Sequence, residues 1–112
     1  MKILIVDDNA ANRSLLRQML SRVGYSSVET DNGVTAIEMV KQQDIDIVLM
    51  DIMMPGMDGY ETTKIIKDHA GDNHIPIIFV TALEGEEALS KALESGGDDY
   101  ISKPIVLDIV ES

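Results

Sequence analysis

The sequence contains no cysteine and no apolar run long enough to span a membrane or to act as a signal peptide. Without cysteine, disulfide bonds, thiolate metal sites and cysteine nucleophiles are excluded, which fits a reducing compartment. The opening stretch after Met1 is apolar only over a few residues. We therefore expect a cytoplasmic protein that has no membrane partner.

Basic residues are also scarce, with 9 lysines and arginines against 20 aspartates and glutamates, and the formal charge is −11. A surface with this charge repels nucleic-acid phosphates and anionic lipids, so direct nucleic-acid binding is not expected. The hydrophobic fraction of 45% and the charged fraction of 26% are ordinary for a folded protein. With 112 residues, the chain is expected to form one domain, residues 1–112, around one core.

Short apolar runs alternate with segments of helical periodicity, which is the pattern of βα units around a parallel sheet. Five strands are expected, at residues 2–6, 27–30, 46–50, 76–80 and 99–102. Helices are expected between Asn9 and Gly24, around Ala36 to Val40, and near residues 58–68 and 86–94. A last helix beginning near Pro104 has room for only about two turns, so we expect it to be truncated.

The spacing of apolar residues also predicts which side chains of the helices face the sheet. In the first helix these are Leu15, Leu16, Met19, Leu20 and Val23. In the second helix they are Ala36, Ile37 and Val40, and in the helix near 86–94 they are Ala88, Leu89, Ala92 and Leu93.

The apolar content of the strands predicts their order in the sheet. Central strands of a parallel sheet are covered on both faces, so the fully apolar runs at 47–50 and 77–80 should be central. The second strand, where Val28 is the one strongly apolar residue, and the weakly apolar fifth strand should be edges. The result is a single doubly wound (βα)5 sheet of order 2-1-3-4-5, in which ligands bind between strands one and three at their carboxyl ends.

Polar residues follow four of these strands at that same rim of the sheet. They are Asp7 and Asp8, Asp51, Thr81, and Lys103. Taken singly, the aspartates are more often turn residues, Thr81 a strand end and Lys103 a solvated surface residue, but the same chemistry would use all five. Three carboxylates, a hydroxyl and an ammonium group together indicate a metal-assisted phosphate site.

Three carboxylates in one cleft repel one another, so they take up protons or hold a cation. Mg²⁺ prefers oxygen ligands of this kind, and Mn²⁺ would accept similar ones. Asp51, which ends the most central apolar strand, is the best candidate for a nucleophile that forms an aspartyl phosphate. The Lys103 ammonium would neutralise phosphoryl charge, and the Thr81 hydroxyl and the Ala82 backbone N–H would donate to a phosphoryl oxygen.

Four blocks of sequence around these residues resemble the response-regulator receiver domain of two-component signalling. They are Val6-Asp7-Asp8-Asn9, Met50 to Gly59, Val80-Thr81-Ala82 and Asp98 to Pro104. The resemblance covers residues 2 to about 110 and implies a flavodoxin-like receiver fold. It also implies a cytoplasmic phosphoprotein of a phosphorelay, a response regulator whose Asp51 is phosphorylated by a histidine kinase or a histidine phosphotransfer protein.

The same resemblance implies roles for individual residues. Asp7 and Asp8 would be the acidic pair that places Mg²⁺, with Asp8, Asp51 and the backbone carbonyl of Met53 as ligands. The peptide bond between Lys103 and Pro104 would be cis.

The resemblance also implies a phosphoacceptor switch, which assists its own phosphorylation and dephosphorylation, rather than a turnover enzyme. Thr81 would move toward the phosphoryl group and Tyr100 would turn inward, which changes the face formed by the fourth helix, the fifth strand and the fifth helix. From the residues alone, a half-buried tyrosine on an edge strand is the favoured interpretation of Tyr100.

Other classes of function remain open at this point. A receiver-fold binding module that is never phosphorylated would not need the acidic, threonine and lysine positions. A Mg²⁺-dependent phosphatase with an aspartyl-phosphate intermediate needs an aspartate where Met53 stands, and a Rossmann-type nucleotide site needs a glycine-rich turn where Asp7 and Asp8 stand. The cognate kinase, the output, the phosphoryl lifetime and the choice between a monomer and a phosphorylation-dependent dimer do not follow from the sequence; an output domain would lie beyond residue 112.

Overall fold

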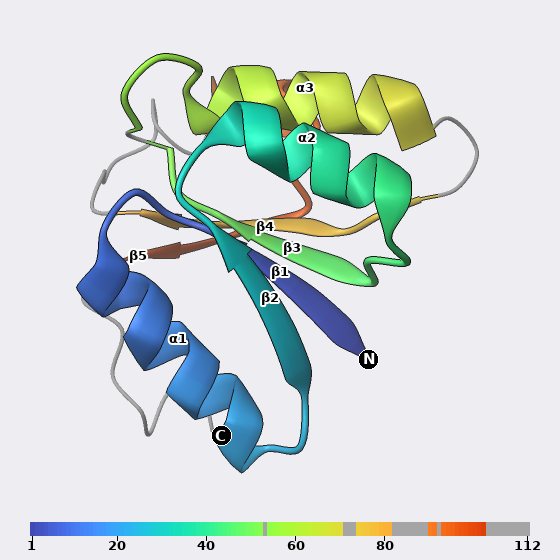
Figure 1. Cartoon of the computed structure of the whole chain (residues 1–112). Helices are drawn as coiled ribbons and strands as arrows, with labels where there is room; N and C mark the ends of the chain where they lie inside the picture. The colour runs from blue at the N-terminus through green and yellow to red at the C-terminus, as the bar shows by residue number, and fades with distance from the viewer. Residues whose placement is uncertain (53, 71–73, 82–89, 92, 103–112) are drawn as a thin grey trace.

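A computed structural model describes residues 1–52, 54–70, 74–81, 90–91 and 93–102. The described part of the chain contains a five-stranded parallel sheet of order β2-β1-β3-β4-β5 (Figure 1). The strands are β1 (Lys2–Val6), β2 (Ser26–Thr30), β3 (Ile47–Met50), β4 (Ile77–Thr81) and β5 (Asp99–Ser102). The predicted α/β class and strand order are confirmed.

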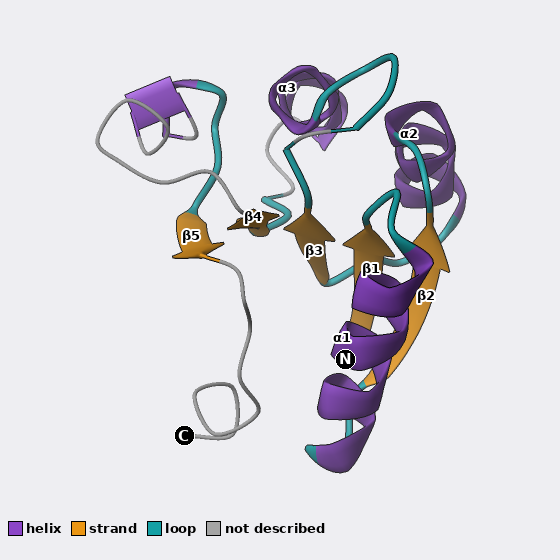
Figure 2. Cartoon of the chain, turned by 90° about the vertical axis from the view of Figure 1, so that its left-hand side faces the viewer, coloured by secondary structure: helices purple, strands orange, loops and turns teal. Residues whose placement is uncertain are grey.

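Helices cover both faces of the sheet (Figures 1 and 2). Helix α1 (Ala10–Arg22) lies on one face, and α2 (Gly33–Gln42) and α3 (Gly59–Ala70) lie on the other. Asn9 caps α1, because its side chain accepts a hydrogen bond of 3.1 Å from the backbone N–H of Asn12. None of the helices that the structure describes has the length and apolar character of a membrane span.

The core has one layer on each side of the sheet, because successive side chains of a strand point to opposite faces. From β1, Leu4 and Val6 join the layer under α2 and α3, whereas Ile3 and Ile5 join the layer under α1. The inward residues predicted for α2 are confirmed: Ala36, Ile37 and Val40 are all buried.

Three of the predicted inward residues are wrong. Leu15 is 41% exposed, because the buried stripe of α1 is narrower than predicted and consists of Leu16, Met19 and Leu20. Val23 is 42% exposed and follows the last helical residue, so it is not on the helix face. Leu93 is 55% exposed while Ser95 is buried; residues two apart point to opposite sides of a helical turn.

The boundaries differ from the prediction by one or two residues, which is the usual uncertainty at element ends. Helix α3 continues through Ala70, two residues beyond the predicted end at residue 68, and β4 includes Thr81. Of the predicted fourth helix, Ser90, Lys91, Leu93 and Glu94 are helical. Ala88, Leu89, Ala92 and the helix predicted after Pro104 lie outside the described residues.

Candidate functional site

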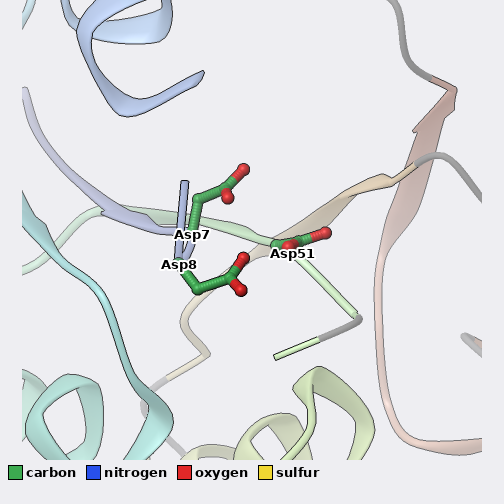
Figure 3. Close-up of side chains that lie close together, drawn as sticks. All are labelled: Asp7, Asp8 and Asp51. Atoms are coloured by element: carbon green, nitrogen blue, oxygen red, sulfur yellow. The ribbon is translucent and has the colours of Figure 1, made fainter. Parts of the chain in front are cut away.

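The acidic residues meet because β1 and β3 are adjacent and in register. Val6 pairs with Met50, so the residues that follow these two strands emerge side by side. The backbone N–H of Asp51 donates a 2.8 Å hydrogen bond to the carbonyl of Val6, which joins the two strand ends. Asp7, Asp8 and Asp51 each place a carboxylate oxygen so that the three atoms lie within 4.8 Å of one another (Figure 3).

The three carboxylates differ in how firmly they are held. Asp7 is 1% exposed and Asp51 is 5% exposed, whereas Asp8 is exposed. Asp7 Oδ1 accepts a 2.9 Å hydrogen bond from the backbone N–H of Asn9, and the Asp7 carbonyl accepts one of 2.8 Å from Arg13. The start of α1 therefore holds Asp7, while Asp8 stands at the mouth of the site.

The chemistry of this cluster fits a hard divalent cation. The donor atoms are carboxylate oxygens, the ligands preferred by Mg²⁺ and Mn²⁺, and their mutual repulsion is relieved by positive charge. Among the described residues, this is the one group of three or more acidic, histidine or cysteine side chains close enough to share an ion. Beside it, a pocket of about 420 Å³ is lined by Asp8, Ile52, Met54, Pro55 and Asp58.

The backbones of two further predicted site residues lie where the sheet topology requires. Thr81 is the last residue of β4, the strand next to β3, so its backbone reaches the same rim as Asp51. Tyr100 lies in β5 and pairs with Phe79 of β4. The remaining predicted residues, Met53, Ala82, Lys103 and Pro104, lie outside the described residues, as does the predicted cis peptide bond.

Sequence reasoning missed two residues that shape the acidic site. The N–H of Gly59 donates a 2.9 Å hydrogen bond to the Ile52 carbonyl, which brings the start of α3 against the chain beside Asp51. Asp58 accepts a 2.9 Å hydrogen bond from the N–H of Glu61 and so caps α3. An aspartate followed by a glycine before a helical segment is a cap signal that could have identified them.

Comparison with known proteins places this arrangement in context. A family model described as "Response regulator receiver domain" matches residues 3–111. Chemotaxis protein CheY of Halobacterium salinarum is 44% identical over 103 residues, which cover 92% of this chain and 84% of that protein. Response regulator PleD of Caulobacter vibrioides is 41% identical over 104 residues, 93% of this chain but only 23% of PleD. The chain thus spans about a quarter of the length of that relative.

A solved structure supports the same comparison. The receiver domain of sensor histidine kinase PA1611 from Pseudomonas aeruginosa PAO1 superposes with a TM-score of 0.88 at 31% sequence identity. The match covers 98% of this chain and 90% of that domain, which was solved with a magnesium ion coordinated in its active-site cleft.

Proposed function

This chain belongs to the response regulator receiver family of two-component signalling, and from that premise we propose that it is a phosphoacceptor switch whose phosphorylated residue is Asp51. The observation that carries the proposal is the acidic cluster itself. Asp51 directly follows a central strand, is 5% exposed, and lies close to two further carboxylates that follow the neighbouring strand.

The reaction that this site supports is transfer of a phosphoryl group to a carboxylate. A carboxylate oxygen of Asp51 forms a bond to phosphorus while the bond from phosphorus to a histidine nitrogen of the donor breaks, and the imidazole leaves with a proton. Burial beside Asp7 limits the orientations of the Asp51 side chain, which favours in-line attack. The product is an aspartyl phosphate, and the chain acts as a phosphoacceptor switch that assists its own phosphorylation and dephosphorylation, rather than as a turnover enzyme.

Asp7, Asp8 and Asp51 would hold Mg²⁺, with the Met53 backbone carbonyl as a further ligand and Mn²⁺ as a substitute. Bound there, the ion would neutralise negative charge on the Asp51 carboxylate and on the phosphoryl oxygens. The Asn9 amide fixes Asp7, which would orient the acidic pair formed by Asp7 and Asp8. The exposed Asp8 would complete the site from the solvent side.

The remaining roles concern the response to phosphorylation. Lys103 would neutralise phosphoryl charge, and Thr81 and the Ala82 N–H would donate to phosphoryl oxygens. Movement of Thr81 would let Tyr100 turn inward and change the surface around β5, with Lys103 and Pro104 joined by a cis peptide bond. These contacts would bias a surface with two stable arrangements.

The signalling context follows from the same family. A histidine kinase or a histidine phosphotransfer protein would supply the phosphoryl group in the cytoplasm. Residues 1–112 would act as one receiver domain, and the changed surface would act on a partner protein or on an output domain beyond residue 112. The chain spans only 23% of PleD, so the output of a longer protein is a separate question.

Labelling with a small phosphodonor tests the proposal directly. Wild-type protein incubated with phosphoramidate and Mg²⁺ should gain one phosphoryl group by intact mass, and both Asp51→Asn and chelation of the metal should abolish the gain. Asp44→Asn is the matched control, because it makes the same change of side chain at an exposed residue outside the acidic cluster. Undiminished labelling of Asp51→Asn would refute the assignment.

A further inference from the structure

The first residue of α3 lies directly on the backbone of Asp51. A methyl group built on Gly59 would overlap the carbonyl oxygen of Asp51, and it would lie 2.8 Å from Ile52 Cα and 3.0 Å from the carbonyl carbon of Asp51. Real side-chain carbons do not approach backbone atoms this closely, and backbone atoms have no flexible end that can move aside. The absence of a side chain at residue 59 therefore allows α3 to press against the peptide that follows Asp51.

A second close contact lies between α2 and α3, and it involves the helix that bears Gly59. A methyl group on Gly33, the first residue of α2, would overlap Thr62 Oγ1 and lie 3.3 Å from Thr62 Cβ. Gly33 is buried and Thr62 is 0% exposed, so a shift of either residue would have to be accommodated by its buried neighbours. The start of α2 thus rests against the first turn of α3.

Hydrogen bonds connect these two contacts. Thr62 Oγ1 donates to the Asp58 carbonyl at 2.8 Å, and the Thr62 N–H donates to the same oxygen at 3.1 Å. The neighbouring Gly59 N–H donates to the Ile52 carbonyl at 2.9 Å. A displacement of Thr62 would therefore move residues 58 and 59 and, through them, the peptide between Asp51 and Ile52.

We propose that Gly33 and Gly59 are positioning residues for Asp51, and that the packing of α2 on α3 through Gly33 and Thr62 sets the orientation of the Asp51 side chain. This inference rests on the proposed function for its chemical consequence. Its structural content, the placement of the Asp51 backbone by α2 and α3, can be measured separately. A misplacement of about 1 Å in an active site can lower a reaction rate by about a hundredfold, and for a smaller displacement of Asp51 we expect a loss of about tenfold.

The test uses a clash and its relief. Gly33→Ala should shift the amide NMR resonances of Asp51 and Ile52 and lower the rate of labelling by phosphoramidate by about tenfold. Adding Thr62→Ala removes the oxygen that the new methyl group meets, so the double variant should regain the wild-type resonances and most of the rate. Thr62→Ala alone isolates the effect of losing the hydrogen bond to Asp58. Gly59→Ala, whose methyl group meets Asp51 directly, should shift the same two amides, and it replaces Gly33→Ala if that variant does not fold.

Gly24→Ala is the control for general destabilisation. Gly24 has a φ of 87°, so alanine is strained there, but nothing lies within 4 Å of the added methyl group and the residue follows α1. This variant should be less stable and yet label at the wild-type rate. Unchanged Asp51 and Ile52 amides in Gly33→Ala, or an equal loss of rate in Gly24→Ala, would overturn the inference. A wild-type protein that is not labelled would contradict the proposed function, while the amide shifts would still decide the positioning of Asp51.

Discussion

The carboxylate of Asp7 accepts a 2.9 Å hydrogen bond from the backbone N–H of Asn9, whose own side chain caps α1. One residue thus begins the helix and fixes a carboxylate of the acidic site. Its neighbour Asp8 is exposed. The cluster therefore combines a buried carboxylate that the backbone holds with a solvent-exposed one, which suits an ion that is bound and released.

Asn9→Ala should show that the cap of α1 and the acidic site depend on different parts of Asn9, the side chain and the backbone N–H. The side-chain hydrogen bond to Asn12 is lost, so the free energy of unfolding should fall by about 1 kcal/mol. The backbone N–H that holds Asp7 remains, so the rate of labelling by phosphoramidate should stay at the wild-type value. Urea denaturation and mass spectrometry measure the two quantities. Asn32→Ala, at the equivalent cap of α2, should cost a similar amount of stability; a large loss of labelling in Asn9→Ala would contradict this division of roles.

Mg²⁺ should stabilise the fold, whereas the Asp8 carboxylate should destabilise it when no metal is bound. Without metal, Asp8→Asn should raise the free energy of unfolding, because it removes one of three mutually repelling carboxylates. With Mg²⁺ at a hundred times its dissociation constant, wild type should gain about 2.7 kcal/mol, and Asp8→Asn should gain much less. Urea denaturation with Mg²⁺ or with a chelator measures both effects. Glu38→Gln makes the same change of charge at an exposed residue of α2 and should retain the Mg²⁺ gain.

Two neighbouring threonines of α3 should respond in opposite ways to valine. Thr62 and Thr63 are both 0% exposed, but Thr62 Oγ1 donates to the Asp58 carbonyl while Thr63 Oγ1 has no hydrogen-bond partner among the described residues. Thr63→Val removes an unsatisfied buried hydroxyl and should raise the free energy of unfolding by about 1 kcal/mol. Thr62→Val should lower it, because a hydrogen bond is lost. Thermal and urea denaturation of both variants provide the comparison, and a destabilised Thr63→Val would show that the hydroxyl is satisfied in solution.

Asp98 should contribute stability only above the acid range. Burial alone would raise the pKa of this carboxyl, but a 2.7 Å contact with Lys67, the Ile77 amide and the nearby His74 lower it below its ordinary value of 3.8. A carboxyl with a lowered folded-state pKa stabilises the fold above its unfolded-state pKa, and this stabilisation is lost as the pH falls through the folded-state value.

Asp98→Asn should therefore be less stable than wild type at about pH 6, and the difference should shrink toward about pH 3. Urea denaturation at the two values measures the change. The exposed Asp44 provides the control, since Asp44→Asn should show little difference at either pH. A difference for Asp98→Asn that is the same at both pH values would contradict the assigned ion pair.

Much of the fold and the position of the acidic site were predictable, because the relevant signals are local. The apolar runs identify the strands, and their apolar content separates central strands from edges, since only central strands are covered on both faces. The position of Asp51 after a central strand follows from that order. The placement of Lys103 and Met53 and the side-chain arrangement of Thr81 stay predictions.

Contacts between elements were not predictable. Leu15 and Leu16 are the same residue type and adjacent in sequence, yet one is 41% exposed and the other is buried, because the width of the buried stripe depends on how α1 sits on the sheet. Lys67 and Asp98 pair across 31 residues, which no local pattern encodes.

By itself, the sequence determined the class of fold, the order of the strands and the rim at which three aspartates meet, because periodicity and apolar content are properties of short segments. Only the tertiary structure decided how closely α2 and α3 approach and that Gly59 lies against the Asp51 backbone, because those distances depend on the packing of segments far apart in the chain. The acidic residues could be read from the sequence, but the contacts that orient Asp51 could not.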